Sequence, residues 1–584
     1  MLELLAKYSG KAEPGFKSRD IRWAVVLDSK AGFVGLVQLG QPDQKKNQGR
    51  TFTKCPDLSQ PELVSGATAR SHFLVETANV VALYKVTDTK TVEKHQYFIG
   101  MLTEAGKTIP QLAVIANFLK IEETIQRIQK AMAESKVKVG DKVTVQLDGE
   151  FPVEQDYWHD WWRNYRKSLK GEPDKKGNPA LMWCYVSGKL VTPQKTHPKI
   201  EGLADVGGQP SGDVLIGFDK EAYCSYGLQQ STNAAVSEEA MSAYRAALNK
   251  LIKNHSQRLV SARVVHWFKE EVKLAEDPLG WLLEPPEQAE LNAQHEAQKL
   301  LKSIWTGERP DLARNFYYAL TLSGAGGRVM VRDWMEGQFE ELVANVSQWF
   351  SDLEIVEIVQ RDGSLPTRNP KFLVVLGTLV RVLKDLPAPT VAKMWRVAVR
   401  GEAIPYSFLA QTLSRRKMEI IQNKAISLAG MGLIKAYHVR KYRKEGNTTL
   451  AEMLKPKLTE DFPSPAYQCG RLMAVLAGLQ RAALGDVGAG VVQRYYAAAS
   501  TTPALVLGRL TRTSQFHLGK LEPGLAYWYE SKIAGIWSRL QEAPPRTLSL
   551  EEQSLFALGY YQQLADRRVK KSQNTTKEEE KDND

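Results

Sequence analysis

Residues 21–39 read IRWAVVLDSKAGFVGLVQL, two apolar and β-branched runs on either side of a short polar turn. The turn contains Asp28 and Gly32, and such a link between two such runs is typical of a β-hairpin. Further along, residues 137–153 resemble another strand, whereas residues 111–135 carry apolar side chains at helical spacing. The first part of the chain is therefore expected to mix strands with helices.

The same mixture continues in the middle of the chain. Ser237 is a plausible N-cap for a helix over residues 237–259, and residues 285–303 have a second helical pattern. Residues 316–322 and 328–331 look like paired strands. The glycine-rich link between these two strands is interpreted as a turn.

After about residue 365 the pattern becomes almost entirely helical. Apolar residues recur at helical spacing, and prolines divide the pattern into segments. The expected helices cover residues 371–385, 390–400, 405–436, 466–484, 488–500, 504–520, 523–541 and 549–570. Helices joined by short links are typical of a helical bundle.

These patterns predict an α+β fold. Residues 1–365 would form a mixed N-terminal α/β region with antiparallel strands and irregular loops. Residues 366–455 would form a basic helical segment, and residues 456–570 a C-terminal helical bundle. Residues 571–584 are polar and without pattern, which predicts a disordered tail.

Size and charge narrow the possible functions. The chain has 584 residues, and one core rarely extends past about 250–300, so we expect two to four domains. It has 78 Lys and Arg against 66 Asp and Glu, a net charge of +12. This surplus favours a polyanionic partner, with nucleic acid ahead of an anionic membrane. Four scattered cysteines, the lack of a secretory leader pattern and the lack of a membrane-spanning apolar run predict a cytoplasmic protein.

Sequence signatures of enzymes are scarce. The chain has no GxxxxGK[ST] phosphate-binding loop, no HExxH zinc motif and no GxSxG nucleophile motif. Its nine histidines are scattered, and His159–Asp160 is an adjacent pair rather than a converging set of metal ligands. The sequence therefore offers no candidate catalytic residue, metal ligand or cofactor site. The common hydrolases and NTPases are disfavoured more strongly than enzymes in general.

Two segments have the composition of nucleic-acid-binding surfaces. Residues 157–170 contain five aromatic residues and four cations, which suits base stacking and phosphate binding. A position in the core is the favoured alternative for the tryptophans there. Residues 415–446 contain nine Lys and Arg and two acids, a net charge of +7. This segment would form an electrostatic track for a polynucleotide backbone, or simply a solvated helix face.

A third segment, residues 199–212, reads KIEGLADVGGQPSG. Its glycines allow close backbone approach, and Gln209 and Ser211 offer uncharged hydrogen-bonding groups. A loop of this kind suits the minor groove of DNA, where A·T and G·C pairs differ mainly by one donor. Taken alone, the segment is most simply a turn.

Short blocks spread in order along nearly the whole chain carry a family resemblance. Most of them fall in the middle of the chain and in its helical part. They include residues 71–75 (SHFLV), 197–200 (HPKI), 207–209 (GGQ), 211–212 (SG), 225–227 (SYG), 236–238 (VSE), 247–249 (ALN), 470–472 (GRL), 494–496 (RYY), 500–504 (STTPA) and 558–561 (LGYY). Together they resemble the large subunit of the type I-C CRISPR Cascade complex. Each block is weak alone, but the ordered set is specific.

The resemblance implies a binding protein without a catalytic site. Such a subunit contacts the 5′ handle of the crRNA, recognises the protospacer-adjacent motif on double-stranded DNA, helps unwind the target into an R-loop and supports the displaced strand. Its implied partners are the Cascade backbone subunits, the crRNA-processing subunit, small subunits and a helicase-nuclease recruited in trans. The family can also produce its C-terminal region separately, and Met453 is a better candidate start than Met473.

The resemblance also suggests site residues. The motif-reading loop would contain Gly207, Gly208, Gln209 and Ser211. A second candidate reader is the segment Thr68, Ala69 and Arg70, although this segment departs from the usual family pattern. The candidate nucleic-acid backbone contacts are Lys189, Lys195, Lys199, Arg328, Arg332, Arg415 and Arg416, the last two toward the displaced or target strand.

Two other functions stay open from the residues alone. The chain would be a stand-alone nuclease if acids without a sequence pattern converge in the fold. It would be a scaffold if it makes no direct contact with DNA.

Overall fold

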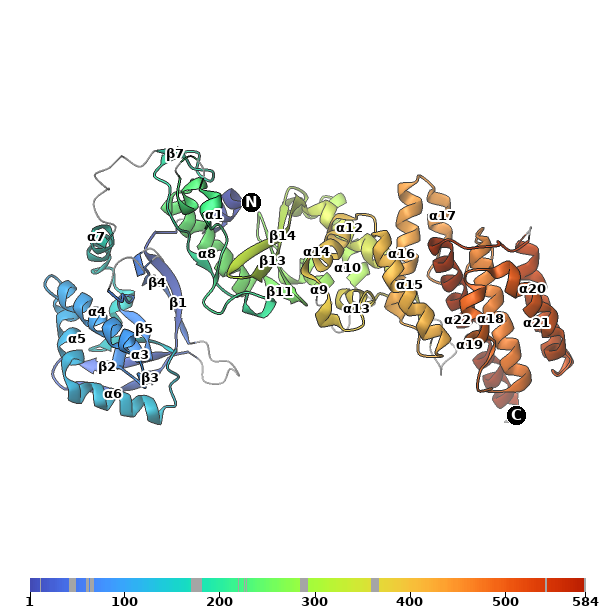
Figure 1. Cartoon of the computed structure of the whole chain (residues 1–584), viewed down its shortest axis with the longest axis horizontal. Helices are drawn as coiled ribbons and strands as arrows, with labels where there is room; N and C mark the ends of the chain where they lie inside the picture. The colour runs from blue at the N-terminus through green and yellow to red at the C-terminus, as the bar shows by residue number, and fades with distance from the viewer. Residues whose placement is uncertain are drawn as a thin grey trace. The chain divides into compact units, whose positions relative to one another are not determined.

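The computed structural model describes the chain apart from residues 11, 41–48, 59–61, 64–67, 170–180, 219, 225, 227, 284–292, 359–366, 541–542 and 582–584, and apart from the side chains of 293 and 567–581. Small sheets lie mainly in the N-terminal half and helices fill most of the C-terminal half, so the predicted α+β class is confirmed (Figure 1). The chain divides into two compact units. Unit 1 contains residues 1–254 and 324–330, and unit 2 contains residues 255–323 and 331–584.

Unit 1 contains a four-stranded sheet in the order β3-β2-β6-β5. The predicted hairpin is confirmed, because β2 and β3 pair antiparallel with Asp28 opposite Gly32. Strand β6 is shorter than the predicted strand, because Asp148 and Gly149 turn the chain with positive φ angles. The strands are β2 (Trp23–Asp28), β3 (Gly32–Gln38), β5 (Val75–Thr77) and β6 (Lys142–Leu147).

Four helices pack with this sheet around one hydrophobic core. The single helix predicted over residues 111–135 is in fact two, because Ile121 takes an extended conformation and ends one helix while preceding the next. Leu119 before this break and Ile125 after it are both buried, so the apolar faces of both helices remain in the core. The helices are α3 (Ala78–Ala82), α4 (Thr89–Gly106), α5 (Pro110–Lys120) and α6 (Glu122–Glu134).

The same core includes an aromatic cluster beneath a two-stranded ribbon. Trp158 and Trp162 are fully buried, and Trp162 stacks on Phe73 with ring centroids 5.6 Å apart. The indole of Trp162 donates a hydrogen bond to the carbonyl oxygen of Gly15 over 2.7 Å. The surrounding elements are β1 (Phe16–Ile21), β4 (Arg50–Pro56), η1 (Pro152–Glu154) and α7 (His159–Leu169).

The rest of unit 1 is built on one long helix, α8 (Glu238–Asn254), which packs with α1 (Leu2–Ser9). Ser237 caps α8 as predicted, since its hydroxyl accepts the backbone N–H of Ala240. Four short strands and three 3-10 turns precede the helix. They are β7 (Met182–Trp183), β8 (Leu190–Val191), β9 (Lys199–Ile200), η2 (Ala204–Val206), β10 (Asp213–Val214), η3 (Glu221–Tyr223) and η4 (Gln230–Asn233).

Unit 2 begins with strands in the order β11-β12-β13-β14. The predicted strands at 316–322 and 328–331 are both present and longer than expected. They are accompanied by helices that bury Trp349 and Phe339 in the unit 2 core. The elements are β11 (Ser256–Leu259), β12 (Ala262–Phe268), η5 (Leu274–Glu276), α9 (Pro278–Leu283), α10 (Ala293–Trp305), α11 (Pro310–Ala313), β13 (Phe316–Ala325), β14 (Arg328–Gln338) and α12 (Phe339–Leu353).

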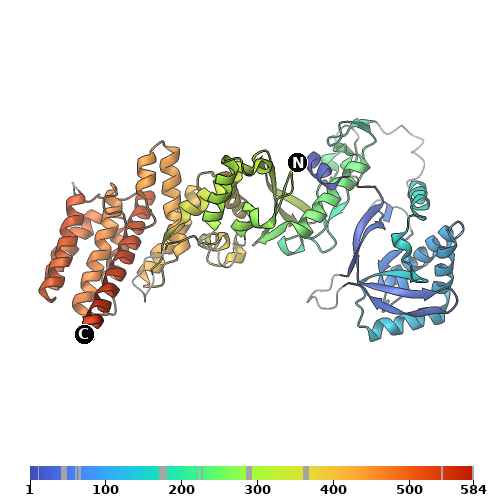
Figure 2. The same cartoon turned by 180° about the vertical axis from the view of Figure 1, so that it is seen from behind.

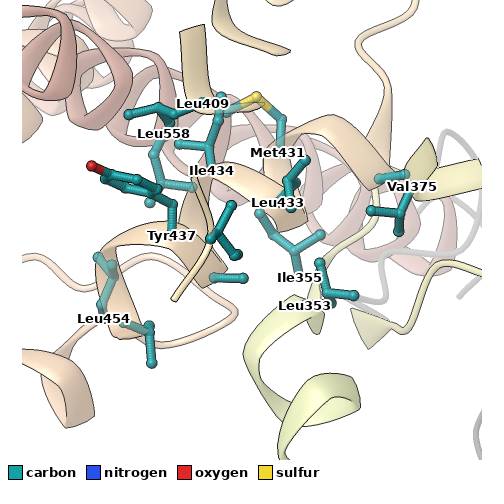
Figure 3. Packing of buried hydrophobic residues seen from close by; sticks show 14 of the residues in the cluster. Leu353, Ile355, Val375, Leu409, Met431, Leu433, Ile434, Tyr437, Leu454 and Leu558 are labelled. Carbon is teal, nitrogen blue, oxygen red and sulfur yellow. The ribbon is translucent and has the colours of Figure 1, made fainter. Parts of the chain in front are cut away.

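Helix α16 (Leu428–Lys444) lies at the centre of the next layer. Every residue from Gly430 to Arg440 on this helix is buried, and Figure 3 shows its Met431, Leu433 and Ile434 among apolar side chains from neighbouring elements. The neighbours are β15 (Ile355–Val356), β16 (Thr367–Arg368), α13 (Phe372–Gly377), η6 (Leu383–Asp385), α14 (Ala388–Arg400), α15 (Tyr406–Ile421) and α17 (Thr448–Met453).

The C-terminal helices form the predicted bundle around α18 (Pro465–Leu484), which packs along α22 (Leu550–Lys581) (Figure 2). Gly470 and Gly559 make this close packing possible, because a side chain on either would overlap the opposite backbone. Helix α22 continues through most of the segment expected to be disordered, since no Gly or Pro follows Gly559. The other helices are α19 (Val491–Ala499), α20 (Pro503–Leu518) and α21 (Pro523–Arg539).

The core of unit 2 is continuous from Leu259 to Ala565. By packing, therefore, the chain divides near residue 254, whereas the sequence pattern suggested a change near residue 365. Met453 ends α17, and Met473 is fully buried within α18. Across the parts of the chain that the structure describes, no helix is both long and apolar enough to cross a membrane.

Candidate nucleic-acid interface

The glycine-rich loop of residues 201–212 connects two paired strands of unit 1. Strands β9 and β10 are antiparallel, with Ile200 opposite Asp213. The short turn η2 follows β9, and Gly207 then reverses the chain with a φ of 89°. Gly212 brings the chain into β10 with a φ of 88°. A residue with a side chain would be strained at either position, so glycine is required at both ends of the 207–212 segment.

A buried carboxylate holds this loop from inside. Asp213 is fully buried, and its two oxygens accept the backbone N–H of Gln209 over 3.1 and 3.2 Å. The N–H of Gly208 donates to the carbonyl oxygen of Leu203 over 2.9 Å. Gly208 carries no side chain where the Asp213 carboxylate and this carbonyl approach it. The backbone of the loop is therefore fixed by its own residues.

The tip of the β13–β14 hairpin, residues 324–330 of unit 1, packs against this loop. A side-chain carbon at Gly207 would lie 2.8 Å from the carbonyl oxygen of Gly324, and one at Gly324 would overlap the backbone of Gly208. The N–H of Val214 donates to the carbonyl oxygen of Gly327 over 2.9 Å. The glycine-rich link between β13 and β14, which was predicted to be only a turn, thus supports the loop of residues 201–212.

The side chains at residues 209–211 of this loop are uncharged and accessible. Gln209, Pro210 and Ser211 are exposed. Lys199 reaches across from β9 and donates to the Ser211 hydroxyl over 3.3 Å. Arg328 is placed beside the loop, because it pairs with Val214 across β10 and β14. The structure therefore brings together six predicted residues, namely Gly207, Gly208, Gln209, Ser211, Lys199 and Arg328.

The second candidate reader lies in a different environment. Thr68 is exposed, but the guanidinium of Arg70 donates to the carbonyl oxygen of Glu62 over 2.6 Å. Glu62 also pairs with the buried Arg166, which binds Glu238 as well. Arg70 thus stands beside an ion-pair network, and its role in DNA recognition stays a prediction.

Two predicted backbone contacts lie on or just after the β7–β8 hairpin. Lys189 and Lys195 are exposed, and neither ammonium pairs with a residue that the structure describes. The same hairpin exposes Trp183 and Tyr185, whose side chains are 66% and 72% accessible. We did not single out these two rings from the sequence. The available signal was a Trp and a Tyr in a short stretch that contains lysines and lacks acids.

The aromatic and basic cluster predicted over residues 157–170, of which Lys170 lies outside the described residues, contributes Trp158 and Trp162 to the core of unit 1. Trp158 and Trp162 are buried, which confirms the favoured interpretation of these tryptophans. Arg163 pairs with Glu13 and Asp160, and Arg166 is buried between Glu62 and Glu238. The prediction of a phosphate contact is therefore wrong for the buried Arg166, whereas it stays a prediction for Arg163, whose side chain is 39% accessible.

The electrostatic track predicted over residues 415–446 is wrong for the cations that the fold buries. Lys435 and Arg440 are buried in α16, and Arg440 and Arg443 bind the two oxygens of the buried Asp352 over 2.8 and 2.6 Å. Burial lowers the pKa of Lys435 to about 8. Two acids from elsewhere in unit 2, Asp352 and Glu551, thus offset part of the positive charge of this segment.

The prediction that Arg416 contacts a nucleic-acid backbone is wrong. Its side chain is 1% accessible and pairs with Glu419 over 2.5 Å, so it does not face solvent. The adjacent Arg415 is half-buried and donates to the carbonyl oxygen of Gly377. Arg332 is also half-buried and donates to the Ser323 hydroxyl over 2.8 Å. Arg415 and Arg332 remain predictions.

The titratable groups that the structure describes form no recognisable metal centre. Within the described part of the chain, no three His, Cys, Asp or Glu side chains are grouped as a metal ion would require. His159 packs edge-on against Trp158, and burial lowers its pKa. The adjacent Asp160 pairs with Arg163. The two residues of the His159–Asp160 pair thus have structural partners.

The comparison with known families places this α+β chain in the class of CRISPR-associated proteins. A family described as CRISPR-associated protein (Cas_Csd1) matches residues 3–568. The chain belongs to this Cas_Csd1 family, and it is a Cascade-type large subunit, as the resemblance implied. No curated protein matches the chain.

Proposed function

We propose that this subunit recognises the protospacer-adjacent motif on double-stranded DNA with residues 207–212. The observation that supports the proposal is the rigid presentation of Gln209. Its backbone is held by the buried Asp213, while its side chain is exposed beside Gly327. An amide offers both a donor and an acceptor, and these are the groups that distinguish base pairs in the minor groove.

Lysines near the loop supply the sequence-independent part of the binding. Lys199 lies within hydrogen-bonding distance of Ser211, and Arg328 lies across β10 from Lys199. Lys195 and Lys189 precede β9 and are exposed. In this proposal Lys and Arg bind phosphates and position the duplex, whereas Gln209 and Ser211 contact base edges. Thr68 and Arg70 are a second contact to the same motif.

The remaining steps follow from membership of a Cascade-type complex. The chain binds the 5′ handle of the crRNA, helps open the target into an R-loop and supports recruitment of a separate helicase-nuclease. Arg332 and Arg415 contact nucleic-acid backbones. The chain itself performs no catalysis and acts with the backbone, crRNA-processing and small subunits, away from any membrane and in the cytoplasm.

A binding experiment on the assembled complex tests the proposal. A duplex library with randomised bases beside the protospacer identifies the preferred motif, and matched and mismatched duplexes are then compared by gel shift. The proposal expects each unfavourable base to cost about 1–3 kcal/mol of binding free energy. Equal binding to all library members would show that this complex reads no motif.

The two alternative functions give different outcomes. A nuclease would cleave labelled DNA when the purified chain is incubated with Mg²⁺ or Mn²⁺, and the proposal expects no cleavage. A scaffold would leave the DNA affinity of the complex unchanged when Lys195 and Lys199 are replaced by alanine. The proposal expects that affinity to fall.

A further inference from the structure

The β7–β8 hairpin of unit 1 presents two aromatic rings to solvent. Trp183 and Tyr185 flank Cys184, whose side chain is only 2% accessible. The Cys184 sulfur accepts the backbone N–H groups of Ser187 and Ser237, both over 3.4 Å. Cys184 therefore points inward, and the residues on either side of it point outward.

The hairpin is anchored rather than loose. Trp183 is opposite Leu190, and the N–H of Cys184 donates to the carbonyl oxygen of Lys189 over 2.8 Å. The N–H of Tyr185 donates to the carbonyl oxygen of Ala235, just before α8 begins. These bonds fix the backbone under both rings. Rings held in this way lose little conformational freedom when they bind a planar partner.

The charged residues of the segment that carries the rings are all positive. Between residues 181 and 200 the chain has three lysines, Lys189, Lys195 and Lys199, and no Asp or Glu. Exposed aromatic rings with surrounding cations are the features by which proteins hold single-stranded nucleic acid, because the rings stack on bases and the cations bind phosphates.

Helix α8 sets the separation between the β7–β8 hairpin and strand β9, which leads into the loop of residues 201–212. The hairpin is bonded to Ser237 at the start of the helix, while Glu201, next to β9, is bonded to Asn249 through its backbone N–H over 3.0 Å. Twelve helical residues span about 18 Å. This distance corresponds to about five nucleotides at roughly 3.4 Å each. A strand that leaves a duplex at the loop would therefore reach the rings within a few nucleotides.

We infer that Trp183 and Tyr185 form a stacking site for the displaced single strand of the target DNA. The inference rests on the proposed function, because that function places the duplex at residues 207–212. It adds a site and a kind of contact that motif reading does not require.

The experiment uses labelled dT15 with the full chain, and the double variant Trp183→Ala, Tyr185→Ala. Each ring that is removed can no longer stack on a base, and each lost stack should weaken dT15 binding at least about fivefold. Trp183→Phe, Tyr185→Phe keeps both rings and should restore most of the affinity. The control is Trp305→Ala, Tyr527→Ala, which removes two rings of similar exposure, 67% and 73%, from unit 2 and should change nothing.

A second measurement uses the assembled complex on its target. Permanganate reactivity of thymines in the displaced strand, within about five nucleotides of the motif, should rise in the alanine variant. The ratio of matched to mismatched duplex binding should stay as in the wild type, whereas Gln209→Ala should alter that ratio and leave dT15 binding intact. The two proposals can therefore fail separately.

Several results would overturn the stacking site. The alanine variant could bind dT15 as tightly as the wild-type chain does, or the wild-type chain could fail to bind dT15. Loss confined to a labelled rU15 probe would assign the hairpin to RNA. Failure of the variant to join the other subunits, with dT15 affinity unchanged, would assign it to a protein interface.

Discussion

Gly208 and Gly324 lie in contact without room for a side chain on either, although 115 residues separate them in the sequence. One belongs to the loop between β9 and β10, and the other to the β13–β14 hairpin. Because the Asp213 carboxylate also fills the space beside Gly208, the loop is enclosed from two sides. Gln209 emerges from this support with a fixed backbone, and the proposed reading of DNA depends on that rigidity.

Gly324→Ala should disturb the loop through this contact. The new methyl group overlaps the backbone of Gly208, so one of the two segments must move, at a cost of about 1–3 kcal/mol of unfolding free energy. Motif discrimination by the assembled complex should fall with it. The matched control is Gly35→Ala, in strand β3, where nothing lies within 4 Å of the added carbon. If Gly324→Ala and Gly35→Ala show the same thermal unfolding and the same motif discrimination, the contact between Gly208 and Gly324 does not support the loop.

Lys195→Ala should weaken DNA binding without changing which motif is preferred. A lysine bound to a phosphate contributes equally to matched and mismatched duplexes, so both affinities should fall together. The slope of log affinity against log salt should also become shallower by about 0.9 for each phosphate that is no longer neutralised. Lys120→Ala, an exposed lysine at the end of α5, is the control and should leave the slope unchanged. A loss of discrimination in Lys195→Ala would mean that the lysine binds a base instead.

Arg416→Ala should affect folding rather than the salt dependence of DNA binding. The substitution removes a buried guanidinium and its ion pair with Glu419, which should cost about 3–5 kcal/mol of unfolding free energy. Chemical denaturation measures that cost. Arg415→Ala is the comparison, because Arg415 is half-buried and remains a candidate DNA contact. A shallower salt slope for Arg416→Ala, with normal stability, would restore the original prediction.

The protein should lose stability as the pH falls below about 6.5. Burial lowers the pKa of His72 and His197 to about 4 and that of His438 to about 3. The folded state keeps these imidazoles neutral, whereas the unfolded chain takes up protons below about 6.5, so acid favours unfolding. Each histidine contributes a slope of up to about 1.4 kcal/mol per pH unit between the two pKa values.

His438→Gln tests this pH dependence. Denaturation midpoints between pH 7.5 and pH 5 should depend less steeply on pH in this variant, because one buried imidazole no longer has to be protonated. His295→Gln, at an exposed position, should leave the dependence as it is. An unchanged slope in His438→Gln would mean that this imidazole does not control the acid transition.

Local patterns predicted much of the fold. The hairpin at residues 21–39 has its expected turn, and α8 begins at the expected cap, because both depend on residues close in sequence. The break at Ile121 was missed, since apolar spacing continues across it and only the tertiary core favours the bend. The pairing of β2 with β6, more than a hundred residues away, left no comparable local signal.

The candidate site was predicted less evenly. Gln209 and Ser211 were found because glycines and small polar residues mark an exposed loop. The support from Gly324 was not found, because close packing of distant glycines has no local pattern. The cations of residues 415–446 were misjudged for a related reason: composition counts charges, whereas Asp352 and Glu551, which neutralise several of them, come from other helices.

The most direct test of the proposed function is motif discrimination by the complex with Gln209→Ala. Binding of the assembled complex to matched and mismatched duplexes gives a discrimination ratio for each variant, with Gln111→Ala, an exposed glutamine on α5, as the control. If Gln209 contacts a base edge, its removal should reduce discrimination by about 1–3 kcal/mol while Gln111→Ala keeps the wild-type ratio. A wild-type ratio in Gln209→Ala would show that the loop does not read the motif.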